Sequence, residues 1–64
     1  MRMNHVKEIR EARGLTQRQL AEKLHFAQSL LSDIERGTRD PWPKARRRLA
    51  RIFKVSESEL FPQD

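Results

Sequence analysis

Residues 16–37 read TQRQLAEKLHFAQSLLSDIERG, and this stretch decides the fold. Thr16, followed three residues later by Gln19, forms a capping box, which predicts a helix over about 17–24. A short break follows, and a second helix is predicted over about 28–36 because the next residue is a glycine, a common helix terminator. The first of these helices is predicted to bury the apolar stripe Leu20, Ala21 and Leu24. The stretch therefore predicts two helices joined by a tight turn.

The predicted helix over 28–36 has two chemically different faces when its residues are spaced at about 100°. Leu30, Leu31 and Ile34 lie on one side, which is the predicted buried face. The opposite side carries short polar residues and one arginine, namely Gln28, Ser29, Ser32, Asp33 and Arg36. A merely solvated helix face is usually rich in Lys and Glu, whereas Gln, Ser and Asp can form hydrogen bonds with base edges. This face is predicted to read DNA bases, and an ordinary exposed face is the alternative.

The remaining elements are also predicted to be helical. Asn4 can cap a first helix, which ends before Gly14. A further helix is predicted over about 43–53, because Pro41 and Pro43 mark a loop and a helix start. The run 56–59 is a second capping box and opens a last short helical turn at 60–61. No run has the alternating pattern of a strand. The sequence thus predicts an all-α domain of five helices.

The composition limits the classes of protein to which the chain can belong. Its 64 residues suffice for one small domain, predicted over 1–64, and they include no cysteine, which excludes a disulfide or a thiolate metal site. The two histidines cannot close a metal site alone. No Gly-rich phosphate loop or catalytic cluster is present, so we expect neither enzyme activity nor a cofactor. No apolar run approaches the roughly 20 residues of a membrane span, and we expect a soluble, cytoplasmic protein.

Positive charge is concentrated in one segment. The formal net charge is +5, and residues 36–54 carry eight Lys or Arg against one Asp, whereas 55–64 carry three acids and no base. Such a segment suits a polyanion, either nucleic acid or an anionic membrane, although a solvated Arg-rich helix face has the same composition. Membrane binding would use Trp42, Ile52 and Phe53, but the apolar stripe of this segment is more simply explained as core. Nucleic acid is therefore the favoured partner.

Residues 17–37 together resemble the helix-turn-helix of the lambda-repressor-like (Cro/XRE-type) DNA-binding domains, and the similarity extends over about 4–61. The resemblance depends on Ala21, Leu31 and Ile34 at fixed spacing, with a glutamine at the start of the stretch and Glu-Arg-Gly at its end. The chain is similar to stand-alone members such as small phage repressors and the controller proteins of restriction–modification systems. The resemblance implies a compact five-helix domain whose second and third helices form the helix-turn-helix.

The resemblance also implies roles for individual side chains. The helix over 28–36 would be the recognition helix, presented to the major groove of DNA. The implied base-reading residues are Gln28, Ser29 and Asp33, with Ser32 second. The implied phosphate contacts are Arg10, Gln17, Arg36, Thr38, Arg39 and Lys44. Gln17 is also expected to brace Gln28, and Arg10 and Glu35 resemble the inter-helix ion pair of the family, which holds the fold or shares a phosphate.

Three positions depart from the family pattern. His25 occupies a turn position where relatives usually have Gly, and His tolerates positive φ better than most residues, so we expect modest strain and no change of fold. Ala27 replaces the usual Ser or Thr cap, a loss that typically costs about 1 kcal/mol. Arg46 falls on the inward half of 43–53, where we expect its stem on the core edge and its guanidinium in solvent or beside an acid.

The function implied by the resemblance is that of a transcription regulator, a repressor or autoregulator, which binds a specific double-stranded DNA operator as a homodimer. An antitoxin-type module that binds a protein partner as well as DNA is the alternative. A dimer needs a self-complementary surface, and the C-terminal helices carry more apolar residues than a small core is expected to bury. The expected interface is Ile52, Val55 and Phe61, and the alternative is that Ile52 and Phe61 only complete the monomer core.

Overall fold

Five α-helices form the protein in the computed structural model, which describes residues 4–62. In chain order the helices are α1 (Val6–Ala12), α2 (Gln17–Leu24), α3 (Gln28–Arg36), α4 (Pro43–Phe53) and α5 (Glu57–Leu60). Within the described range no residue is in a β-strand. The prediction of an all-α fold is confirmed, and so are the three predicted ranges that correspond to α2, α3 and α4. The ends of the predicted domain, 1–3 and 63–64, lie outside the described residues.

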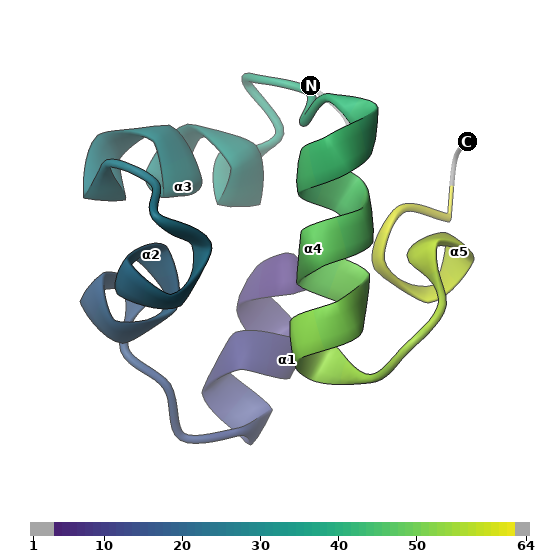
Figure 1. Cartoon of the computed structure of the whole chain (residues 1–64), viewed down its shortest axis with the longest axis horizontal. Helices are drawn as coiled ribbons and strands as arrows, with labels where there is room; N and C mark the ends of the chain where they lie inside the picture. The colour runs from purple at the N-terminus through teal and green to yellow at the C-terminus, as the bar shows by residue number, and fades with distance from the viewer. Residues whose placement is uncertain (1–3, 63–64) are drawn as a thin grey trace.

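The helices are arranged around α4, which crosses the middle of the molecule (Figure 1). In this view α2 and α3 lie on one side of α4, α5 lies on the other side, and α1 lies behind its lower part. α2 packs against both α3 and α4, and α4 packs against α5. The N–H of His5 donates to the carbonyl of Leu60 at 2.9 Å, so the chain entering α1 is tied to the end of α5. The domain measures 26 × 23 × 20 Å, which leaves room for one apolar core.

The core is formed by side chains from all five helices. Its largest fully buried members are Val6, Leu20, Leu24, Leu31, Ile34, Leu49, Phe53 and Leu60. Each side chain of this size contributes about 1.5–3 kcal/mol when it is removed from water. The predicted stripe of α2 is confirmed, because Ala21 is also buried, at 3% exposure.

The start of α2 shows the predicted capping box in full. The backbone N–H of Gln19 donates to Thr16 Oγ1 at 3.0 Å, and the backbone N–H of Thr16 donates to Gln19 Oε1 at 2.8 Å. These bonds satisfy two backbone donors near the start of the helix. The box therefore fixes where α2 begins and, with it, the position of Gln17.

Two other helix boundaries differ slightly from the prediction. α1 has His5 in the capping position, although the N–H of Val6 still donates to Asn4 Oδ1 at 3.1 Å. The last helical turn is Glu57–Leu60, earlier than predicted, because Phe61 already has non-helical backbone angles, φ −129° and ψ 73°. Both shifts are small, since capping signals locate a helix end only to within a residue or two.

Three helices, α2, α3 and α4, end at a residue in the left-handed conformation, and α1 is followed by one after its capping residue Arg13. These residues are Gly14 (φ 70°), His25 (φ 60°), Gly37 (φ 80°) and Lys54 (φ 57°). At His25 the following N–H, from Phe26, donates to the carbonyl of Ala21 at 2.9 Å, which is the bond of a Schellman motif. Glycine adopts positive φ without strain, whereas the Cβ of His or Lys crowds the backbone. The expected positive φ at His25 is confirmed, whereas the positive φ at Lys54 was not predicted.

Two arginines close helix C-termini that lie within the fold. Arg13 Nη2 donates to the carbonyl of Phe53 at the end of α4, at 2.6 Å. Arg48 Nη1 donates to the carbonyl of Leu24 at the end of α2, at 3.2 Å. The last carbonyls of a helix have no partner within that helix, and a cation there also interacts favourably with the helix dipole. Part of the arginine content of the chain thus stabilises the fold.

Arg46 covers the end of the core, as predicted. Its guanidinium carbon lies 4.9 Å from the centre of the Phe61 ring, and its Nε atom lies 3.5 Å from the carboxylate of Glu57. Phe61 is only 5% exposed, so the expectation that it lies on an exposed apolar edge is corrected: it completes the core of the monomer. Ile52 and Val55 are half-buried, pack against the core and keep part of their surface in contact with solvent.

Candidate nucleic-acid interface

An aromatic pair holds the turn between α2 and α3 against the start of α4. The ring centroids of Phe26, in the turn, and Trp42, in the capping position of α4, are 5.2 Å apart. Ala27 occupies the capping position of α3 and makes no side-chain cap bond, as predicted. The position of α3 therefore depends on packing of the turn as well as on its own backbone. Trp42 remains 41% exposed.

Arg10 and Glu35 form an ion pair that joins α1 to α3. Arg10 Nε donates to Glu35 Oε2 at 2.7 Å, and Nη2 donates to Oε1 at 3.4 Å. A third donor, Nη1, reaches the carbonyl of Leu15 at 2.8 Å. The two side chains are 10% and 3% exposed, so water screens the pair little. All three guanidinium nitrogens of Arg10 are engaged within the fold, which favours its structural role over a phosphate contact.

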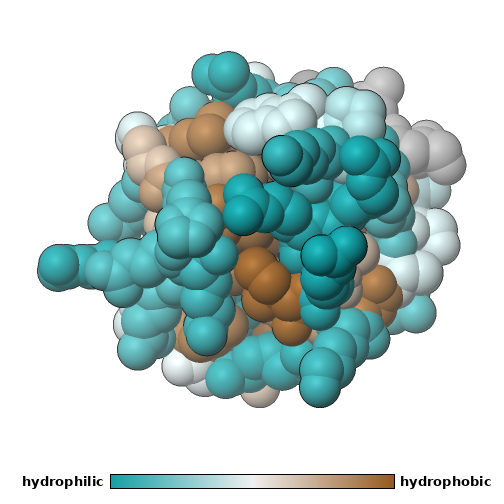
Figure 2. All heavy atoms as spheres, viewed as in Figure 1, coloured by the Kyte–Doolittle hydropathy of each residue, from teal (hydrophilic) through white to brown (hydrophobic). Residues whose placement is uncertain are grey.

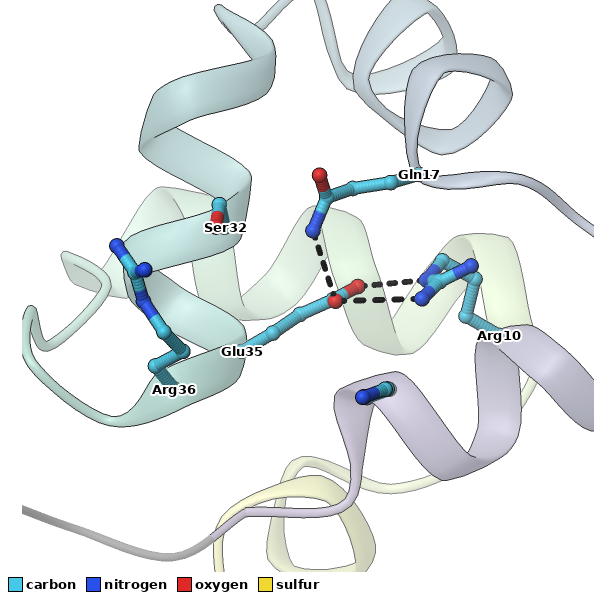
Figure 3. A pocket seen from close by; sticks show the side chains of 6 residues that line it. Arg10, Gln17, Ser32, Glu35 and Arg36 are labelled. Carbon is cyan, nitrogen blue, oxygen red and sulfur yellow. Dashed lines mark hydrogen bonds and ion pairs between the residues drawn. The ribbon is translucent and has the colours of Figure 1, made fainter.

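Glu35 also begins a chain of hydrogen bonds that ends on the exposed face of α3. Gln17 Nε2 donates to Glu35 Oε1 at 3.1 Å, and Gln28 Nε2 donates to Gln17 Oε1 at 3.3 Å. Because a carboxylate only accepts, Gln17 turns its amide nitrogen to Glu35 and its oxygen to Gln28. The expected bracing of Gln28 by Gln17 is confirmed. Figure 3 shows Gln17 and Arg10 converging on Glu35 between α1, α2 and α3.

The other predicted base readers differ in exposure. Ser29 is exposed at the start of α3, whereas Ser32 and Asp33 are half-buried in its middle. Arg36 Nη2 donates to Asp33 Oδ1 at 2.6 Å, which leaves the second carboxylate oxygen of Asp33 able to accept from another donor. Helical spacing keeps these residues on the same side of α3 as Gln28.

The segment 37–42, between α3 and α4, carries further predicted phosphate contacts. Thr38 Oγ1 donates to the carbonyl of Asp33 at 3.1 Å, so this hydroxyl closes the end of α3. Arg39 lies within the segment and Lys44 just beyond it in α4, and both are exposed. The structure thus gives Thr38 a role within the fold and leaves two cations at the surface.

The cations of α4 fall into two groups. In the first group, Arg46 lies beside the carboxylate of Glu57 and Arg48 donates to the carbonyl of Leu24. In the second group the side chains are exposed: Lys44, Arg47 and Arg51. Figure 2 shows hydrophilic side chains over much of this view, with smaller hydrophobic patches between them. Exposed cations attract a polyanion over a distance but carry no information about its sequence.

Two further features of the described residues bear on other functions. Within 4–62, no three His, Asp or Glu side chains are grouped so that they could hold a metal ion. In the same range, no helix is both long enough and apolar enough to cross a membrane. Phe53, which was considered for membrane binding, is fully buried.

Two residues of this region were not among the predicted site residues. Lys7 lines the same pocket as Arg10 and Gln17, and the carbonyl of Leu15 anchors Arg10. A sequence signal exists for Lys7, because residues three apart on a helix lie on one side of it, as Lys7 and Arg10 do. The carbonyl of Leu15 has no such signal, since any residue has a carbonyl and only the fold decides which one faces an arginine.

Residues 6–60 match the family model described as helix-turn-helix. The chain belongs to the helix-turn-helix family. Its α2 and α3 are the two helices of the motif.

Two curated relatives support this assignment. The helix-turn-helix domain is 37% identical over 59 residues to the HTH-type transcriptional regulator ImmR of Bacillus subtilis (strain 168), covering 92% of this chain and 46% of that protein. It is 36% identical over 56 residues to the competence pilus inhibition repressor of Acinetobacter baylyi (strain ATCC 33305 / BD413 / ADP1), covering 88% of this chain and 51% of that protein. The chain thus spans about half the length of these relatives.

Proposed function

We propose that this domain regulates transcription by binding a specific sequence of double-stranded DNA, with α3 in the major groove. The observation that carries the proposal is the chain of bonds from Arg10 through Glu35 and Gln17 to Gln28. It positions a polar side chain at the start of α3, the part of a recognition helix that meets base edges. The names of both relatives support regulation, and that of the Acinetobacter protein supports repression. Because the role requires access to the genome, we propose a cytoplasmic location.

Gln28 is the main base reader in this proposal. One N–H of its amide donates to Gln17, which leaves a second N–H and the carbonyl oxygen for DNA. A donor and an acceptor side by side match N7 and the N6 amino group of adenine. The neighbouring bases are assigned to Ser29, Ser32 and Asp33.

The phosphate contacts of the proposal surround α3. They are Gln17, Arg36, Thr38, Arg39 and Lys44. Of these, Arg39 and Lys44 are exposed cations next to the start of α4, where they can neutralise backbone charge without restricting the base sequence. Arg10 is assigned to the ion pair because its donors are engaged within the fold.

The domain acts as a homodimer in this proposal, since one recognition helix reads one half-site and two half-sites lie about 34 Å apart. The proposed contact is centred on Ile52 and Val55, which keep exposed surface. Ile52 also lines a pocket of about 430 Å³, together with the apolar residues Leu15 and Phe53 and the cations Arg13 and Lys23. We expect Ile52→Glu to give a folded monomer with weak operator affinity in sedimentation and circular dichroism, whereas the matched variant Arg47→Glu remains dimeric. An unfolded Ile52→Glu chain or an unaltered dimer would contradict this interface.

Selection of binding sites from a library of random duplexes tests the central proposal. We expect one symmetric sequence to be enriched, with adenine at a position whose enrichment is lost in Gln28→Ala. If each protomer neutralises about four phosphates, the log–log slope of affinity against salt is about −7 for a dimer. The absence of any enriched sequence would contradict specific binding. A slope shallower than roughly −3 would remove duplex DNA as the principal ligand.

A further inference from the structure

A groove with an apolar floor, which we name the α2–α4 groove, lies between α2 and the end of α4. Its first hollow, of about 430 Å³, is lined by Arg13, Leu15, Lys23, Ile52 and Phe53. An adjoining hollow of about 480 Å³ shares two of these residues and adds Gln19 and Glu22. In Figure 1 the end of α4 and the link from α1 to α2 lie in the lower part of the molecule, whereas α3 lies in the upper part. The first hollow is therefore at the other end of α4 from the helix proposed to read DNA.

The floor of the first hollow is apolar and only partly covered. Phe53 is fully buried, whereas Leu15 and Ile52 are half-buried and pack against the core from the surface. Figure 2, in the same view as Figure 1, shows hydrophobic side chains at the surface beside the lower part of α4. An apolar side chain placed on this floor would be removed from water together with it, which favours binding.

Two cations lie at the rim of the first hollow, and the residues that line it include no acid. Arg13 Nη2 donates to the carbonyl of Phe53 at 2.6 Å, and the guanidinium carbon lies 5.8 Å from the centre of the Phe53 ring, so this cation is held beside the floor. The other N–H groups of the guanidinium can still donate. Lys23 is exposed, and within residues 4–62 it forms no ion pair or side-chain hydrogen bond. A carboxylate next to the floor would accept from both cations without competition from an acid of the same hollow.

The adjoining hollow is polar. Its acid, Glu22, is 69% exposed and lies 3.9 Å from Arg18. Gln19 uses its side-chain oxygen in the capping box, which leaves its amide nitrogen able to donate. These groups suit a polar stretch of chain that continues beyond an apolar anchor. Together the two hollows fit an extended ligand, which favours a peptide segment over a small carboxylate.

A second copy of this chain is a poor occupant for the groove. Among residues 4–62 its one exposed large apolar side chain is Trp42, at 41% exposure. Trp42 occupies the capping position of α4, so it lies at the opposite end of that helix from the first hollow (Figure 1). A contact between Trp42 and the groove would be head-to-tail and would continue into a ring or a filament, in contrast to a closed two-fold dimer. The charge and shape of the groove therefore favour a different protein as its partner.

We propose that the α2–α4 groove is a docking site for a short acidic segment of another protein. A large apolar side chain of the segment packs on Leu15 and Ile52, and a neighbouring Asp or Glu pairs with Arg13 and Lys23. Ile52 also belongs to the proposed dimer contact, so the segment and a second copy compete for it. This last step rests on the proposed function: the bound segment separates the protomers and weakens their binding to the operator.

Selection from a library of random short peptides displayed on phage tests the groove directly. We expect the enriched peptides to carry Asp or Glu next to a large apolar residue, which match the rim and the floor. Lys23→Gln is expected to raise the Kd of these peptides about three- to fivefold, the effect of losing one exposed ion pair. The matched control is Lys7→Gln, which removes the same charge from an exposed site on α1 outside the groove and is expected to leave the Kd unchanged.

Both lysine variants are expected to keep the thermal melt of the wild type, because both side chains are exposed. A library from which no peptide is enriched would overturn the proposal. Equal Kd values for Lys23→Gln and Lys7→Gln would overturn it as well.

Chemical shifts of the backbone amides locate the bound peptide. We expect the amides of Leu15, Lys23 and Ile52 to shift on addition of peptide, and those of Gln28 and Ser29 on α3 to remain unchanged. Ile52→Ala is expected to weaken peptide binding about tenfold, because it removes much of the apolar floor. Shifts confined to α3 would show that acidic peptides only follow the positive charge of the DNA-binding face, and the proposal would fail.

Sedimentation in the presence of an enriched peptide tests the competition with the dimer. We expect saturating peptide to convert the dimer into monomers, whereas the same peptide with Gln in place of its acids leaves the dimer intact. A dimer that persists while the groove is occupied would overturn the competition. Self-association beyond the dimer that disappears in Trp42→Ala, without any enriched peptide, would assign the groove to a second copy and overturn the proposal.

These outcomes separate the inference from its premise. A wild type that binds no duplex, or that never dimerises, contradicts the proposed function, whereas the peptide contact with Lys23 is measured without DNA or a dimer. Specific operator binding together with the absence of any Lys23-dependent peptide contradicts the docking site alone.

Discussion

The outer faces of α3 and α4 are both polar, but they are organised in different ways. On α3, the exposed Gln28 is held by Gln17, which is held in turn by the buried Glu35. On α4, exposed cations such as Arg47 have no comparable chain of partners among residues 4–62. The difference separates two requirements of DNA binding. Discrimination between bases needs a side chain fixed in one orientation, whereas attraction to the backbone needs only charge at the surface.

The largest expected effect concerns the buried part of the α3 arrangement. Glu35→Ala leaves the charge of Arg10 buried and without its carboxylate, so we expect a loss of about 3–5 kcal/mol in the free energy of unfolding. In a domain of this size that loss can unfold the chain. Urea or thermal melts followed by circular dichroism measure it.

The matched control is Glu22→Ala on α2. The side chain of Glu22 is 69% exposed and lies 3.9 Å from that of Arg18, an exposed pair of the kind that contributes little. We expect its melt to stay close to that of the wild type. If Glu35→Ala and Glu22→Ala have the same melting transition, the ion pair does not hold α3 in place and the proposed difference between the α3 and α4 faces is wrong.

The next largest effect is on DNA affinity, and it compares the loss of the Gln28 side chain on α3 with the loss of the Arg47 side chain on α4. Gln28→Ala is expected to lose about 1–3 kcal/mol on the best sequence and to relax discrimination at one or two base positions. Arg47→Ala is expected to lower affinity slightly and equally on all sequences. Competition binding against a panel of single-base operator variants measures both profiles. Identical profiles for the two variants would show that the two faces do not differ in the way proposed.

The sequence predicted more of the α3 face than of the α4 face for physical reasons. The start of α2, the end of α3 and the contact between Gln17 and Gln28 follow from capping residues, a terminal glycine and the fixed spacing of a known motif. The role of Arg48 depends instead on which backbone carbonyl lies opposite it, and that is decided by packing.

The error at Phe61 has a similar cause. A helical wheel counts the faces of one helix at a time, and it does not show a second element folding over a residue. Here Arg46, from α4, covers the ring of Phe61 after α5 has ended. The predicted position of Arg46 at the core edge was correct. That Arg46 covers Phe61 could not be predicted, because it depends on the distance between the two side chains in the fold. The exposed part of the proposed dimer surface is therefore smaller than the sequence suggests.

A smaller effect on stability distinguishes two neighbouring arginines of α4. Arg46→Met removes the contact with Glu57 and the cation above Phe61, so we expect a loss of about 1 kcal/mol in the free energy of unfolding. Arg47→Met removes an exposed charge and is expected to change the melt by less than about 0.5 kcal/mol. Equal melts would mean that Arg46 contributes no more to the stability of the fold than Arg47 does.

The smallest expected effect concerns the turns that follow α2 and α4, both of which use a left-handed residue other than glycine. At Lys54 (φ 57°) the Cβ costs about 1–2 kcal/mol, while glycine adds about 0.5–1 kcal/mol of entropy loss on folding. Lys54→Gly is therefore expected to stabilise the domain by up to about 1.5 kcal/mol. His25→Gly is expected to stabilise it less, because histidine is enriched in this conformation. Arg47→Gly is the contrasting control: in the middle of α4 the same loss of side chain costs about 1 kcal/mol of helix propensity. For a domain of this length, 1 kcal/mol corresponds to about 4–8 °C in Tm, so differential scanning calorimetry resolves the sign of each change. A fall in Tm for Lys54→Gly would show that the lysine side chain contributes more through its contacts than the turn loses through strain.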